Sequence, residues 1–138
     1  MLPSGLSEHI ADEEDLARFL TQSSHYNTVM VKPSAFLPNK SSEGNYETSV
    51  SRHGREPNDR LRAIGQVVAG NSRRLHGAAL FKAQIVRSAQ LEVLADEPPD
   101  RHAVIRGWPL DDDPELQKAK QKERAVAIAS FTEFLPLM

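Results

Sequence analysis

The 138-residue sequence contains no cysteine. That absence excludes disulfide bonds, thiolate zinc sites, iron–sulfur clusters and a cysteine nucleophile, and it fits a reducing compartment. No stretch approaches the roughly 18 apolar residues that a membrane-spanning helix needs, and the first residues lack the basic and apolar regions of a secretory signal. We therefore expect a cytoplasmic protein that does not enter a membrane.

Signature motifs of catalysis and cofactor binding are missing as well. The sequence holds no Walker loop, no G-x-G-x-x-G, no H-E-x-x-H, no G-x-S-x-G and no EF-hand loop. The histidines show none of the spacings typical of zinc sites; they are His9, His25, His53, His76 and His102. We expect no metal and no cofactor, and these patterns leave open whether the protein catalyses a reaction.

Charge is nearly balanced overall but unevenly distributed. The formal net charge is −2, so the whole chain has no field that attracts polyanions. Residues 52–87 nevertheless carry eight basic and two acidic side chains, whereas residues 92–115 carry two basic and eight acidic ones. Such blocks either neutralise one another in the fold or form separate faces, and neutralisation is the more usual outcome.

Local patterns predict one α+β domain over residues 1–138, with residues 1–11 as a flexible arm. Apolar residues at helical spacing, with end signals such as Gly70, predict the helices; β-branched and alternating segments predict the strands. The expected helices span residues 13–21, 61–69, 78–89 and 114–134, and the expected strands span 28–32, 46–51, 91–95 and 102–106. Two hairpins would then form a four-stranded, mainly antiparallel sheet packed by helices.

The clearest local signal begins the long C-terminal helix. Asp113 is a typical N-cap, and Pro114 suits the first helical position. An apolar stripe along this helix is expected to face the core; its members are Leu116, Ala119, Val126, Ala127 and Phe134.

Two segments, 71–77 and 100–108, hold the densest supply of cations, imidazoles and aromatic rings. If the protein has a direct binding site, we expect it where these segments meet. Anion or partner contacts would come from Arg73, Arg74, Arg101, Arg106 and Trp108, and proton transfer from His76 and His102. The alternative is structural: the arginines neutralise neighbouring acids, and Trp108 belongs to the core.

Several short segments resemble a family of short, uncharacterised bacterial proteins. The segments are Val31-Lys32-Pro33, Ala35-Phe36-Leu37-Pro38, Thr48-Ser49-Val50, Leu91-Glu92-Val93, and Asp96, Pro98, Pro99, His102-Ala103 and Ile105. The shared frame is an AF-P segment, an SV strand and a D-P…HA-I hairpin. The resemblance implies no activity. It implies a bacterial, cytoplasmic accessory protein of the kind found in mobile or defence-type gene clusters.

Three functions compete. We expect a non-catalytic interaction or accessory subunit of a bacterial assembly, with a protein partner, because opposite charge blocks can set the register of a complex. One alternative is a metal-independent enzyme on a phosphodiester or nucleotide, with His76 and His102 as acid and base. The other is a nucleic-acid-binding module that uses the basic residues of segment 52–87.

Overall fold

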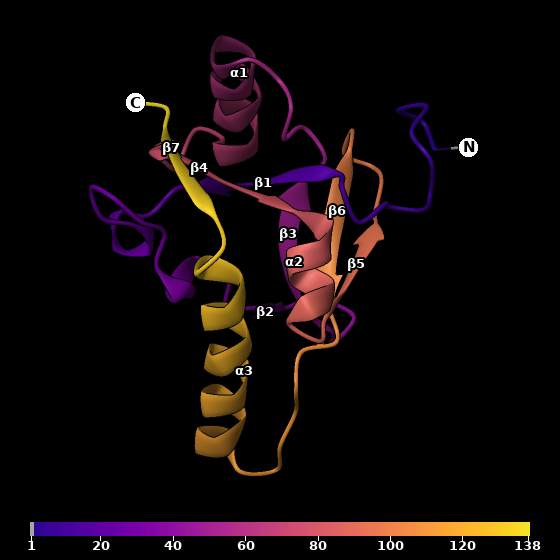
Figure 1. The fold of residues 1–138 in the computed structure, drawn as a ribbon, viewed down its shortest axis with the longest axis vertical. Helices are drawn as coiled ribbons and strands as arrows, with labels where there is room; N and C mark the ends of the chain where they lie inside the picture. Colours follow the sequence, from indigo (N-terminus) through magenta and orange to yellow (C-terminus); the bar gives the residue numbers. More distant parts are fainter. Residues whose placement is uncertain (1) are drawn as a thin grey trace.

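The computed structural model describes residues 2–138 and shows an α+β fold with a mainly antiparallel sheet (Figure 1). The strands are β1 Asp15–Leu20, β2 Asn39–Lys40, β3 Tyr46–Ser51, β4 Gly77–Lys82, β5 Glu92–Ala95, β6 His102–Arg106 and β7 Glu133–Pro136. The helices are α1 Asn58–Ala69, α2 Ala83–Ser88 and α3 Pro114–Ala129, with short 3₁₀ helices at Ser23–His25 and Pro33–Ala35.

The sheet of the described chain has seven strands, so the prediction of four was wrong. Its hydrogen-bonded order is β5-β6-β3-β1-β4-β7, and β2 pairs with β3. The hairpin predicted at 91–95 and 102–106 is confirmed as β5 and β6. The strand predicted at 46–51 is confirmed as β3, but the predicted strand 28–32 forms only an isolated bridge at Val31.

Strand β1 replaces the helix predicted at 13–21. Leu16 and Leu20 belong to the core on one face of the sheet, and Phe19 belongs to the core on the other. A strand that is buried on both faces loses its polar–apolar alternation. Its apolar residues at 16, 19 and 20 then imitate the spacing of a helical face, which explains the error.

The segment 78–89, predicted as one helix, is divided between β4 and the six-residue helix α2. Ala78 and Ala79 are both fully buried because Ala78 lies in the core on one face of the sheet and Ala79 in the core on the other. The C-terminal helix is shorter than predicted: α3 ends at Ala129, and residues 133–136 form β7. Both errors arise in paired strands whose sequences do not alternate apolar and polar residues.

The start of α3 is confirmed, whereas the apolar stripe predicted for it is right only in part, since Ala127 and Phe134 pack against the main core. The Asp113 side chain accepts a hydrogen bond from the Glu115 N–H at 2.9 Å, which makes it the expected N-cap. The buried residues of the helix are Gln121, Ala125, Ile128 and Ala129. Leu116 and Val126 are 52% and 42% exposed, so neither anchors the helix.

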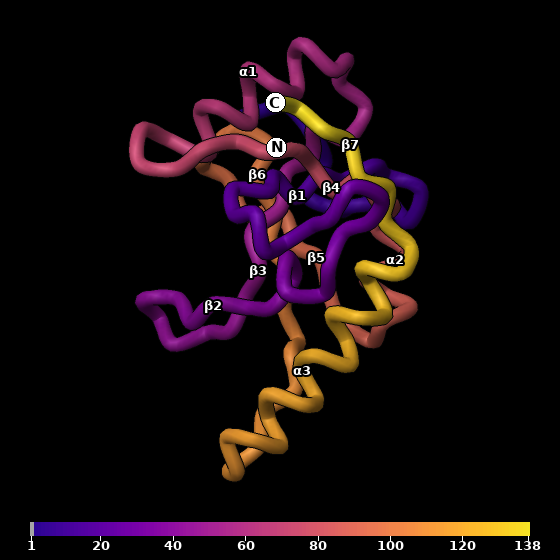
Figure 2. The backbone as a smooth tube through the Cα atoms, turned by 90° about the vertical axis from the view of Figure 1, so that its left-hand side faces the viewer, coloured from indigo at the N-terminus to yellow at the C-terminus, as the bar shows by residue number. Residues whose placement is uncertain are grey.

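Two hydrophobic cores lie on opposite faces of the sheet. The main core contains Leu16, Phe81, Ile105 and residues of α2 and α3. The second core joins α1 to the other face through Leu61 and Phe19. Figures 1 and 2 accordingly show α1 and α3 at opposite ends of the molecule.

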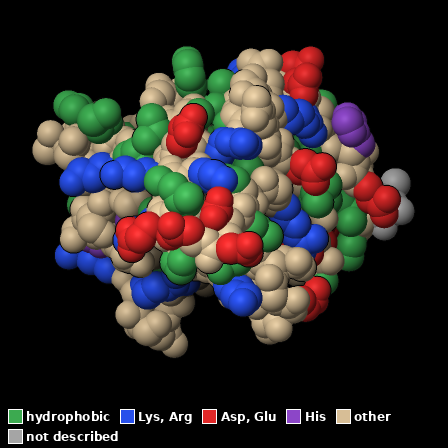
Figure 3. Space-filling model, turned by 90° about the horizontal axis from the view of Figure 1, so that it is seen from below, with side chains coloured by type: hydrophobic (Ala, Val, Ile, Leu, Met, Phe, Trp, Pro, Cys, Tyr) green, Lys and Arg blue, Asp and Glu red, His purple; other side chains and the backbone are tan. Residues whose placement is uncertain are grey.

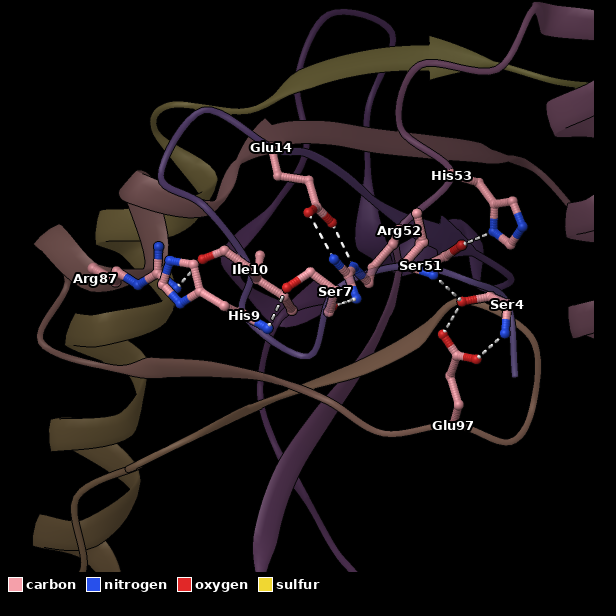
Figure 4. Close-up of polar contacts among 11 residues, drawn as sticks. Ser4, Ser7, His9, Ile10, Glu14, Ser51, Arg52, His53, Arg87 and Glu97 are labelled. Atoms are coloured by element: carbon pink, nitrogen blue, oxygen red, sulfur yellow. Dashed lines mark hydrogen bonds and ion pairs between the residues drawn. The ribbon is translucent and has the colours of Figure 1, made fainter. Parts of the chain in front are cut away.

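The N-terminal segment is fastened to the domain by specific contacts (Figure 4). Ser4 bonds to the Glu97 carboxylate through its N–H at 2.9 Å and its hydroxyl at 2.5 Å. The Arg52 guanidinium donates to the Ser7 carbonyl at 2.7 Å, and the Ile10 side chain is only 2% exposed. These contacts hold residues 4–10 against the folded domain, and the flexibility expected for residues 1–11 stays a prediction.

Carboxylates neutralise most of the basic residues in segment 52–87. Five of the eight basic residues in 52–87 lie within 4 Å of a carboxylate. Their partners are Asp12, Glu14, Asp15 and Glu56, rather than the acids of 92–115. Figure 3 shows basic and acidic side chains interspersed on the face seen from below. Among residues 2–138, no helix combines the length and apolar character needed to cross a bilayer.

Candidate functional site

A pocket of about 270 Å³ lies between α1 and the sheet face formed by β1, β3 and β6. Its walls are mostly apolar, with a few polar and charged groups. The lining residues are Ala17, Arg18, Phe19, Ser49, Val50, Ser51, His53, Arg60, Ile64, Val67, Val68, Pro99, Asp100 and His102.

The pocket exists because α1 covers only part of this sheet face. The helix approaches β1 closely at Gly65, where an added Cβ would lie 2.8 Å from side-chain carbons of Phe19 and Leu75. Ile64 is half-buried, whereas Val67 is 82% exposed, so one apolar side of the helix overhangs the strands without filling the space. The neighbouring face of β3 and β6 therefore stays open beneath α1.

Arg18 is one of the residues that line this pocket, and its guanidinium bridges β1 to β3. Strands β1 and β3 pair at one position, Ala17 with Ser51. Beside it, Arg18 Nε donates to the Ala35 carbonyl at 3.0 Å and Nη1 donates to the Ser49 carbonyl at 2.9 Å. No carboxylate of residues 2–138 lies within 4 Å of this guanidinium. It is thus held by neutral acceptors alone.

The surroundings of Arg18 disfavour its charge. Burial, and to a smaller extent the nearby Arg73 guanidinium, lower the pKa of Arg18 to about 10. The side chain still carries its proton at neutral pH. An anion entering the pocket would therefore meet a partly desolvated cation whose charge nothing yet balances.

Ser51 and His53 form a polar pair at the end of β3 (Figure 4). The Ser51 hydroxyl hydrogen-bonds to His53 Nδ1, and both side chains line the pocket. The other ring nitrogen, Nε2, lies 3.6 Å from a carboxylate oxygen of Asp100. Burial, followed by the Arg101 charge, lowers the pKa of His53. The imidazole is therefore neutral at pH 7.

His102 also borders the pocket, as the first residue of β6. Its Nδ1 lies 2.9 Å from the Asp96 carbonyl oxygen and 3.2 Å from the Asp96 carboxylate. These contacts hold the ring to the β5–β6 hairpin loop. Of the two histidines singled out from the sequence, His102 is the one that borders this pocket.

The structure does not bring the predicted segments 71–77 and 100–108 together. His76 directly precedes β4 and shares a 2.8 Å hydrogen bond with the Tyr26 hydroxyl. Strands β1 and β3 separate β4 from β6, so His76 and His102 are about 14 Å apart at the least, three strand spacings. One substrate position cannot contact both rings directly.

Each predicted arginine of these segments has its own surroundings. Arg73 donates to the Ala69 and Val68 carbonyls at the end of α1. Arg73 and Arg74 border a separate hollow with Arg62. Arg101 pairs with Glu56 at 3.0 Å and Arg106 with Glu47 at 2.9 Å.

Trp108 lies in the main core and is 5% exposed. Its indole N–H donates to the Ile105 carbonyl at 3.2 Å. A side chain with its polar atom satisfied inside the core has little surface left to offer a partner. This placement favours the core alternative over the contact alternative.

Sequence reasoning missed the groups that matter most here: Arg18, Ser51 and His53. Arg18 stood in the segment wrongly predicted as a helix. The sequence patterns place Ser51 at a strand end and His53 in a loop, and only their i, i+2 spacing indicates that the two side chains can meet. Among residues 2–138 no three His, Asp or Glu side chains gather as a metal site would require.

Comparisons of the chain with known family models, curated proteins and solved structures find no match. The resemblance to short bacterial proteins therefore stays an expectation.

Proposed function

We propose that the protein binds a small organic anion with an apolar body in the pocket between α1 and the sheet. The observation that carries this proposal is Arg18: a guanidinium in a mostly apolar pocket with only carbonyl partners. A carboxylate or phosphate would supply the charge-assisted hydrogen bonds that this group otherwise lacks.

The balance of charge around the pocket supports an anionic ligand. Arg18 contributes a positive charge without a carboxylate of residues 2–138 within 4 Å, Arg60 is paired with Glu56 at 3.8 Å, and Asp100 contributes one negative charge. The Asp100 side chain is 69% exposed, so water screens it more than it screens Arg18. The unpaired guanidinium of Arg18 is therefore the group that favours a single negative charge on the ligand.

The walls define the rest of the ligand. Phe19, Ile64, Val67 and Pro99 offer apolar surface that an aliphatic chain or an aromatic ring can cover. The volume of about 270 Å³ lies just below the range of about 300–1,000 Å³ usual for ligand pockets. We therefore expect a compact ligand, such as a short alkyl or aryl carboxylate.

A binding role agrees with the non-catalytic accessory function expected from the sequence, because it requires no reaction. The two alternatives have less support. The separation of His76 and His102 by two strands weakens the predicted phosphodiester enzyme. The pairing of five basic residues with carboxylates leaves fewer free cations for nucleic-acid phosphates.

Isothermal titration calorimetry tests the proposal with hexanoate, benzoate and phenylacetate, each compared with its neutral amide. A hydrogen bond to a charged group contributes about 1.5–3 kcal/mol, so each carboxylate should bind about 10- to 150-fold more tightly than its amide. The variant Arg18→Met keeps much of the side-chain length but removes the charge. It should abolish this preference.

The matched control is Arg124→Met. Arg124 also donates to two backbone carbonyls, those of Ala89 and Gln90, but lies outside the pocket. This variant should keep the preference for carboxylates. Equal affinity for acid and amide in the unmodified protein, or equal losses in both variants, would contradict the proposal.

A further inference from the structure

We propose that Ser51 is a nucleophile, activated by His53, that hydrolyses an ester bond in an organic anion held by the pocket. The substrate class rests on the proposed function, whereas the activation of Ser51 rests on its own geometry. The required elements are a hydroxyl, a base in hydrogen-bond contact with it, and a third group that orients the base.

The backbone places these three groups. Ser51 ends β3, and its side chain points to the sheet face beneath α1, as do its paired neighbours Ala17 and His102. At Gly54 the chain passes so close to β1 that an added Cβ would lie 2.4 Å from the Asp15 carbonyl carbon. This close approach fixes the course of the chain just after His53.

The imidazole has the protonation state that a general base needs. Because burial lowers its pKa, His53 is neutral at pH 7 and has one nitrogen free to accept a proton. A proton on Nε2 faces the Asp100 carboxylate at 3.6 Å, which leaves Nδ1 to accept from the Ser51 hydroxyl. Asp100 is thus a positioning residue that favours this tautomer.

The reaction balances with water as the only co-reactant. The Ser51 oxygen attacks the ester carbonyl carbon, and its proton moves to His53 Nδ1. The tetrahedral intermediate collapses, the alkoxide leaves with the proton from His53, and an acyl group remains on Ser51. Water then attacks this acyl group, again giving its proton to His53, and the carboxylic acid leaves as Ser51 regains its proton.

Ser49 is an internal comparison for Ser51. It lies two residues earlier on β3, on the same face, and lines the same pocket. Ser49 is the more exposed of the two, but His53 hydrogen-bonds to Ser51. Exposure alone would therefore make Ser49 the more reactive serine, whereas activation by the base predicts the opposite order.

Labelling with an uncharged alkyl fluorophosphonate tests the inference in the intact chain. The serine oxygen bonds to phosphorus, fluoride leaves, and the base takes the proton. Peptide mass spectrometry should find the adduct on Ser51 at least about 100-fold faster than on Ser49, since general-base catalysis contributes about 100- to 10,000-fold. Ser49→Ala should label at the rate of the unmodified protein, whereas Ser51→Ala should label only at the slow rate of Ser49.

His53→Gln should slow the labelling of Ser51 by about 100-fold or more. The comparison of Ser51 with Ser49 is made within the unmodified protein. The test therefore still gives an answer if the His53→Gln variant does not fold. Labelling of Ser49 as fast as Ser51, or no faster labelling of Ser51 than in urea-unfolded protein, would overturn the inference. Fast labelling of Ser51 in an unmodified protein that shows no preference for carboxylates over amides would contradict the proposed function alone. Slow labelling of Ser51 in a protein that does prefer carboxylates would contradict this inference alone.

Discussion

Two adjacent acidic residues allow a direct measurement of what burial does to an ion pair. Glu14 pairs with Arg52 and Asp15 pairs with Arg55, and in both pairs the Nε–oxygen distance is 2.6 Å. The Arg52 side chain is 2% exposed, whereas that of Arg55 is 81% exposed. The two ion pairs therefore have the same Nε–oxygen distance and differ in how deeply the arginine side chain is buried.

We compare Glu14→Ala with Arg55→Ala. The first leaves the buried Arg52 guanidinium with only the Ser7 carbonyl, and breaking a buried pair costs about 3–5 kcal/mol. The second removes an exposed partner worth about 0.2–1 kcal/mol. Asp15 also keeps Lys82 at 3.1 Å, which reduces the second loss further.

Urea unfolding measures both losses. Trp108 is the only tryptophan and lies in the main core, so its fluorescence follows global unfolding. With a denaturant dependence of about 2 kcal/mol per molar urea, Glu14→Ala should lower the midpoint by about 1.5–2.5 M and Arg55→Ala by less than about 0.5 M. Equal midpoint shifts in the two variants would refute the argument from burial.

Three further outcomes follow from the structure. Ile128→Ala should lower the free energy of unfolding by about 2–5 kcal/mol, whereas Val126→Ala, on the exposed side of α3, should change it by less than about 0.5 kcal/mol in the same urea assay. The hydrogen bond from Arg55 lowers the pKa of Asp15 below its usual 3.8. The ionised Asp15 carboxylate therefore stabilises the fold above pH 3.8, and this contribution is lost as the pH falls. Urea unfolding midpoints measured between about pH 5 and 2 should show the loss. The His53 ring should titrate below 6.5 by NMR; its neutral form stabilises the fold fully above that pH and progressively less below it.

The helices and strands that could be predicted are those whose local sequence pattern matches the burial they have in the fold. The cap at Asp113, the helix that ends before Gly70 and the hairpin of β5 and β6 all carry such signals. Strands β1 and β4 do not, because both of their faces are buried. Their assignment depends on neighbours that local spacing cannot reveal.

The candidate site was harder to predict than the fold, because its groups come from separate elements. Arg18 reaches the pocket through the pairing of β1 with β3, and Asp100 approaches His53 through the pairing of β3 with β6. Only the sheet order brings these residues together. The prediction that segments 71–77 and 100–108 meet was based on how densely charged and aromatic residues occur along the chain. That density contains no information on how far apart two segments lie across a sheet.

A crystal structure of the protein grown with the tightest-binding carboxylate of the titration series tests the central claim most directly. The account predicts ligand density beneath α1, with a carboxylate oxygen about 2.7–2.9 Å from the Arg18 guanidinium and the apolar body against Ile64 and Val67. An empty pocket at saturating ligand, or a ligand whose carboxylate faces solvent while its apolar body lies against Arg18, would contradict it.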